Sequence, residues 1–213
     1  MRAFAVLVAV VVLSGCSSYS TPKPPSGVFV KALQAYPWAL QAAHAWDPQA
    51  KVHAILGFEL TRVTVTTKTN VIQWLGIDAD EHVGDGRAST WGFFFHHADG
   101  KGDRYLVVVD GHNTTLLARL ALADEAQVPV ADLPTVFLDS DAADAAALKV
   151  GQGAAKDVGP PASMESFLYA AGSPGNVTWT WAVTIRYARD VAYVLVDATD
   201  GHATLANVDH VFH

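Results

Sequence analysis

Two stretches of this chain share one pattern of β-prone segments and turns, and this pattern constrains the fold more than any other feature. The strand-like segments of the first stretch are 90–97, 104–110 and 114–120. Those of the second stretch are 178–187, 191–197 and 202–208. Because short turns rich in Gly, Asp and Asn separate the segments, each stretch predicts a three-stranded antiparallel meander.

The two meanders align on a few prominent residues. The aligned pairs are Trp91 with Trp181, Tyr105 with Tyr193, and Asp110 with Asp197. Hairpin turns absorb a small difference in the spacing between Trp and Tyr. The pattern favours an internal duplication, and the alternative is that two short meanders look alike by chance.

An Ala-rich segment precedes each meander and predicts a helix. The first covers 37–46, with Pro37 in the first turn and Asp47-Pro48 at the end. The second covers 140–149, where Ser140 and Asp144 indicate the start and Gly151 and Gly153 the end. The chain is therefore expected to be α+β, with two related halves of one helix and one antiparallel sheet each.

The region between the first helix and the first meander has no counterpart in the second half. Residues 62–67 predict another strand, and 70–77 predict a short helix. Residues 78–86 form an acidic loop that lacks the frame of a calcium-binding loop, so a solvated loop is expected. Residues 121–134, which include two prolines, are expected to connect the halves.

Cys16 is the only cysteine, so no disulfide can form within the chain and stability must come from a core. It follows the apolar run 3–13 directly, in the order Leu13-Ser14-Gly15-Cys16. The run is too short for a helix that spans a membrane, which needs about 20 residues. An ordinary secretory peptide is the other alternative, and it would leave a cysteine at the cleavage position unexplained.

This N-terminus resembles the lipobox of prokaryotic lipoproteins. The resemblance implies cleavage before Cys16 and a diacylglyceryl group on its sulfur. It implies a protein anchored in the cell membrane or outer membrane, facing the periplasm or the exterior. Residues 1–15 are then the signal peptide, and the Pro- and Ser-rich residues 16–27 are a flexible tether.

The second half, residues 132–213, resembles the PepSY domain. The matching residues are Trp181-Ala182-Val183 and Tyr193-Val194-Leu195-Val196-Asp197-Ala198-Thr199-Asp200-Gly201. The first half, residues 28–122, matches more weakly through Trp91, Tyr105 and Asp110. The resemblance implies export to the cell envelope, a cystatin-like sheet wrapped on a helix, and no catalytic residues. Peptidase inhibition has been proposed for this domain. From the residues themselves, Asp197 is expected to close a turn that ends at Gly201.

Charge and motifs narrow the function classes. Without the signal peptide, 13 basic residues oppose 21 acidic ones, and this net charge of −8 argues against nucleic-acid binding. No nucleophile elbow, P-loop or zinc motif occurs, so no catalytic residue, metal ligand or cofactor is predicted. His96 and His97 are adjacent in a strand and must point to opposite faces, which disfavours one shared metal site.

Two tryptophans offer a candidate binding surface. Trp179 and Trp181 are two residues apart in a strand and share one face. That face is either an exposed binding surface or the face that packs on the helix. The sequence favours a non-enzymatic module that binds a protein or peptide, with an envelope peptidase among the candidate partners. The alternatives are a metal-assisted hydrolase that uses the histidines and a structural scaffold of the envelope.

Overall fold

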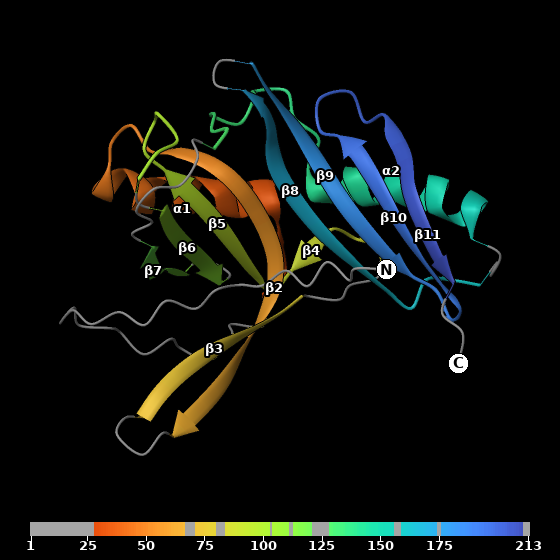
Figure 1. Ribbon diagram of the computed structural model, residues 1–213, viewed down its shortest axis with the longest axis horizontal. Coiled ribbons are helices and arrows are strands. Elements are labelled where there is room, and N and C mark those ends of the chain that lie inside the picture. Colours follow the sequence, from red (N-terminus) through yellow and green to blue (C-terminus); the bar gives the residue numbers. More distant parts are fainter. Residues whose placement is uncertain are drawn as a thin grey trace.

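The computed structural model has an α+β fold in which two helices lie on one side of a large antiparallel sheet (Figure 1). It describes residues 28–66, 71–79, 84–102, 104–110, 113–120, 128–155, 159–173 and 176–210. For 58–66, 71–79 and 113–120 it describes the backbone alone. The prediction of an α+β protein is confirmed.

Eight strands follow one another across the sheet in the order β11-β10-β9-β8-β2-β5-β6-β7, and β3 pairs with β2 outside this path. The helices are α1 (Ala32–Trp46) and α2 (Ser140–Ala154). The strands of the first half are β2 (Lys51–Thr66), β3 (Val71–Ala79), β5 (Thr90–His96), β6 (Arg104–Asp110) and β7 (Asn113–Leu120). Those of the second half are β8 (Ser163–Ser173), β9 (Asn176–Arg186), β10 (Asp190–Asp197) and β11 (Ala203–His210). Two short strands, β1 (Val30–Lys31) and β4 (Arg87–Ala88), pair separately.

The register of the strands reveals an approximate two-fold symmetry. Each half consists of a helix and a four-stranded meander, with the β3 hairpin as an addition to the first half. Gly57 of β2 lies opposite Trp91, just as Leu168 of β8 lies opposite Trp181. Between these positions, Leu56 pairs with Phe167, so the symmetry axis passes through the contact between β2 and β8.

Trp91 and Trp181 have the same structural role in the two halves. The indole Nε1 of Trp91 donates to the carbonyl of Val30 at 2.8 Å, and that of Trp181 donates to Leu138 at 2.9 Å. Each carbonyl belongs to the residue two positions before its helix. Both indoles are fully buried. Each tryptophan therefore fixes the segment that leads into the helix of its own half.

The two helices begin beside each other, and one carboxylate serves both starts. Asp139 Oδ1 accepts from the backbone N–H of Ser140 at 2.8 Å and from that of Leu33 at 3.0 Å. A negative charge there complements the positive ends of both helix dipoles. The same junction needs Gly86, whose φ is +64° and whose added Cβ would lie 2.1 Å from the Asp141 nitrogen. Lys31 and Asp141 form an ion pair beside it.

Both predicted meanders are present, as β5-β6-β7 and β9-β10-β11. The expected alternation also holds, because Trp91, Phe93 and Phe95 are buried on the helix side and Phe94 lies on the opposite face. The alignment of Tyr105 with Tyr193 is wrong. Tyr105 is buried and pairs with Phe95, whereas Tyr193 is exposed and points to the other face. The spacing from tyrosine to aspartate differs by one residue between the two halves, and this difference places the two tyrosines on opposite faces of the sheet.

Both helices are longer than predicted. α1 begins five residues before Pro37, since the Gln34 side chain caps the Lys31 N–H at 3.0 Å. In α2 the N-cap is Asp139 rather than Ser140, and the helix continues through Gly151 and Gly153. A Cβ on Gly151 would lie 2.7 Å from Ile185 Cδ1, so this glycine lets the helix approach the sheet rather than ending it.

The prediction for 70–77 is wrong, and strand β8 was missed, as were the short strands β1 and β4. Residues 71–79 form β3 instead of a helix, because they pair along nine positions with the long strand β2. Figure 1 shows this hairpin extending beyond the rest of the sheet. Strand β8 had no prediction, although it joins the halves through β2.

Candidate functional site

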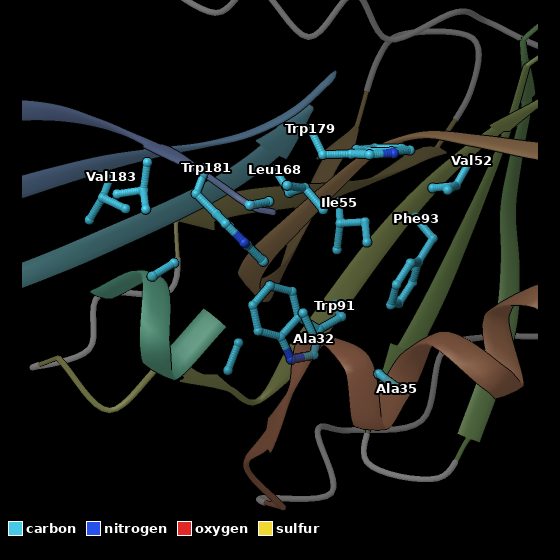
Figure 2. Packing of buried hydrophobic residues seen from close by; sticks show 14 of the residues in the cluster. Ala32, Ala35, Val52, Ile55, Trp91, Phe93, Leu168, Trp179, Trp181 and Val183 are labelled. Atoms are coloured by element: carbon cyan, nitrogen blue, oxygen red, sulfur yellow. The ribbon is translucent and has the colours of Figure 1, made fainter. Parts of the chain in front are cut away.

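The two tryptophans predicted as a binding surface are not available for binding. Trp179 is 2% exposed and Trp181 is fully buried. Both rings contact Phe137, each with a centroid distance of 6.4 Å. Figure 2 shows the Trp181 side chain directed from the sheet towards the helices, and both residues belong to the hydrophobic core. The binding hypothesis for this pair is therefore corrected, because their face of β9 is the one that the helices cover.

The opposite face of the same strands is more accessible. On β8, Phe167 and Tyr169 stack with ring centroids 5.7 Å apart, and they alternate with the buried Leu168. At one end of this face, Arg186 donates to Glu165 at 2.8 Å. The second half thus presents a sheet face with aromatic side chains and one ion pair at its end.

Three of the six exposed large apolar side chains among the described residues lie near the edge of this half. Tyr193 and Leu195 of β10 are each 37% exposed on the open face. Leu205 of β11 is 38% exposed and pairs with Val194, which points to the helix side. The three residues Tyr193, Leu195 and Leu205, called the edge surface below, therefore place apolar atoms on both faces of the sheet margin. Isolated exposed apolar residues are ordinary, whereas a group of them at one sheet margin is a candidate contact surface.

A second candidate site, which is polar, lies at the far end of the first half. His97 Nδ1 lies 2.7 Å from Asp47 Oδ2, and the Trp46 ring stacks on Tyr105 beneath them at 3.5 Å. Asp47, His97, Asp99 and Lys101 line an open hollow of about 550 Å³. The N–H of Gln49, followed by the hydrogen bond from His97, lowers the pKa of Asp47. Asp47 could orient the imidazole of His97. The described lining residues of the hollow, however, include no serine, threonine or cysteine that could act as a nucleophile.

His96 lies on the other side of the same strand end, as the alternation predicts. Its ring is 1% exposed and makes an edge contact with His53 at 5.5 Å. Burial, followed by the positive charge of Arg104, lowers the pKa of His96 to about 3. Burial also lowers the pKa of His53, although the Pro129 carbonyl opposes this effect. The strand separates His96 from His97, so the two histidines share no site.

Other predicted residues have structural roles or fall outside the described residues. Asp197 Oδ1 accepts from Thr199 N at 2.7 Å, and Gly201 has a φ of +77°, which confirms the predicted turn. Among the described residues, no group of three or more His, Cys, Asp or Glu side chains could hold a metal ion. Cys16, His82, His112 and His213 lie outside the described part.

Two features of the structure have little or no signal in the sequence. The pairing of His53 with His96 joins residues from separate strands, and neither belongs to a motif. The double role of Asp139 depends on a contact with Leu33, which is 106 positions away in the chain. The one available hint of a cap was that Asp139 stands directly before a predicted helix.

Comparison with known proteins gives little guidance. No protein-family model matches the chain, and no curated protein matches it. A crystal structure of a "putative lipoprotein" from Clostridium difficile 630 is similar over 82% of this chain and 91% of its own, with 14% identity and a TM-score of 0.47. A similarity of this size carries no inference about fold or function. Neither described helix has the length and apolar character needed to cross a membrane.

Proposed function

We propose that this protein is a lipid-anchored module of the cell envelope that binds a protein or peptide partner at the edge surface. The observation that carries the proposal is the grouping of Tyr193, Leu195 and Leu205 on the last two strands. Aromatic and large aliphatic side chains are the residues that anchor protein interfaces. Positions on both faces of the margin suit a partner that wraps around β11.

The anchoring part of the proposal comes from the N-terminal sequence. Cleavage before Cys16 and its lipidation would attach the chain to the membrane, and two acyl chains give stable attachment. Residues 16–27 would then hold the folded body away from the lipid surface. The two PepSY-like halves, 28–122 and 132–213, belong to this proposal, as does an envelope peptidase as partner.

The anchor and the binding surface are tested separately. Cys16→Ser is expected to move the protein from the membrane fraction to the soluble fraction of fractionated cells, because the thioether to lipid cannot form. A protein that stays in the membrane fraction would contradict the lipid anchor. This result leaves the binding surface untouched, so the second test is independent.

For the binding test, the tagged full chain is used to capture partners from detergent-solubilised envelope. The double variant Tyr193→Ala/Leu195→Ala is expected to lose them, since removing central interface anchors reduces affinity about tenfold or more. Val136→Ala is the control, because Val136 is 75% exposed and does not belong to the edge surface. Trp179 and Trp181 are unsuitable for this purpose since their replacement would damage the core.

The outcomes separate the candidate functions. A partner that is lost with the edge variant and retained by the control supports the proposal. A partner retained by both variants places the interface elsewhere, as expected for a structural scaffold. No partner at all contradicts a binding module, and stoichiometric metal in the purified protein would then favour the hydrolase that uses the histidines.

A further inference from the structure

Residues 128–132, called the connector segment, join the first half to the second and dock on the end of β2. Val128 N donates to the Gly100 carbonyl at 3.0 Å, and Ala131 N donates to the Val52 carbonyl at 3.2 Å. Lys51 and Asp132 form an ion pair at its outer end. His53 Nδ1 lies 3.0 Å from the Pro129 carbonyl, so a neutral His53 that carries its proton on Nδ1 donates to the segment.

His96 lies behind His53 in an environment that does not suit a charged ring. Its side chain is 1% exposed, and neither ring nitrogen has a hydrogen-bond partner among the described residues. Arg104 lies directly opposite His96 in the pairing of β5 with β6. A proton on His96 would therefore place a second positive charge beside a guanidinium, without solvent or an acceptor to stabilise it.

The charges around His96 are mostly positive. Arg104, His53 and His97 each oppose its protonation, and Asp99 is the single described group that favours it. Burial is nevertheless the largest effect on the pKa of both His96 and His53. The protonated rings become acceptable only when water reaches them, and the connector segment is the part of the chain docked against His53.

We propose that His53 and His96 form an acid-sensitive latch, which holds the connector segment on the sheet at neutral pH and releases it on acidification. Both rings are neutral in the closed state. In the open state they are hydrated and titrate as ordinary histidines. Acid therefore favours the open state, and the link between the two halves becomes flexible without unfolding either half.

The direction and size of this pH effect follow from the linkage between histidine protonation and opening of the latch. The pKa of His96 is about 3 in the closed state, against about 6.5 for a hydrated histidine. The latch is intact above pH 6.5 and weakens as the pH falls below it, because the open state binds a proton that the closed state does not. For one histidine, the ratio of open to closed molecules rises about thirtyfold between pH 7.5 and pH 5.0. His53 adds to this response.

Hydrogen exchange on the full chain tests the latch. After correction for the intrinsic exchange rate, the amides of Val128 and Ala131 are expected to lose protection about thirtyfold between pH 7.5 and pH 5.0. The amide of Leu138, which donates to Ala198 at 2.7 Å in the second half, is expected to keep its protection. His96→Phe keeps an aromatic ring that cannot titrate, so most of the acid response should disappear. His202→Gln is the control, since His202 is exposed in a turn.

Three results would overturn the proposal. They are wild-type amides without acid-dependent loss of protection, a His96→Phe variant with the wild-type response, and an equal loss at Leu138. If His96→Phe does not fold, an NMR titration of the wild-type His96 ring replaces it. A ring that titrates near pH 6.5 while Val128 and Ala131 stay protected contradicts the latch, and a ring that titrates only together with their exposure supports it.

Discussion

Replacing Trp181 with phenylalanine tests the claim that one hydrogen bond fixes the entry into α2. The change removes the indole N–H that donates to the Leu138 carbonyl at 2.9 Å, in a fully buried position. The part-buried carbonyl would lose its partner, which costs about 1–3 kcal/mol. The smaller ring also leaves unfilled space, which adds roughly 1–2 kcal/mol. The expected loss in the free energy of unfolding is therefore about 2–5 kcal/mol.

Trp179→Phe is a matched control on the same strand. Trp179 is 2% exposed, contacts the same Phe137 ring as Trp181, and makes no hydrogen bond through its indole within the described part of the chain. It should lose the packing contribution alone, about 1–2 kcal/mol. Trp91→Phe should behave like Trp181→Phe instead, because Trp91 donates to Val30 at 2.8 Å in the symmetry-related position.

Urea unfolding, followed by far-UV circular dichroism, measures these differences in the free energy of unfolding when the variants share the same m-value. Each kcal/mol should also lower the melting temperature by about 2–4 °C in a chain of this size. Equal losses for Trp179→Phe and Trp181→Phe would refute the reasoning, since the hydrogen bond would then contribute nothing. A Trp91→Phe variant that resembles Trp179→Phe would refute the equivalence of the two helix entries.

Two further substitutions probe the junction between the helices. Asp139→Ala should destabilise the protein by about 1–3 kcal/mol in the same unfolding assay, because the N–H groups of Leu33 and Ser140 lose one shared acceptor; a change below about 0.5 kcal/mol would argue against a double cap. Gly86→Ala should prevent normal folding or greatly lower the melting temperature, because of its positive φ and the 2.1 Å approach of the new Cβ to backbone. Gly153→Ala is its counterpart in α2, where a Cβ meets nothing within 4 Å, so that variant should keep or raise stability by up to about 1 kcal/mol. Similar outcomes for the two glycines would contradict the steric argument.

Patterns that depend on neighbouring residues could be predicted from the sequence. The alternation of Trp91, Phe93 and Phe95 with Phe94 fixed which side chains share a face, because the side-chain period of a strand is two residues. The turn after Asp197 was predicted for the same reason, since its hydrogen bonds reach two and three residues along the chain. The α+β class and both meanders follow from such local signals.

Features that depend on pairing with another strand were missed or wrong. The buried positions of β8 include Ser166 and Ala170 beside Met164 and Leu168, so they carry a weak strand signal. This strand acquires its place from β9 along its whole length and from β2 at the centre of the sheet. Residues 71–79 likewise become a strand through their pairing with β2. Intrinsic preference cannot anticipate which strand will pair with a segment, whether the partner is the preceding strand, as for β3, or lies far away in the chain, as β2 does for β8.

The sequence by itself determined that Trp179 and Trp181 share a face and that His96 and His97 do not. Only the tertiary structure decided that the helices cover the tryptophans, which moved the candidate binding surface to Tyr193, Leu195 and Leu205. It also decided that the buried His96 meets His53 beneath the connector segment. The physical reason is that local periodicity sets the relative direction of side chains, whereas burial and charge depend on the segments that pack against them.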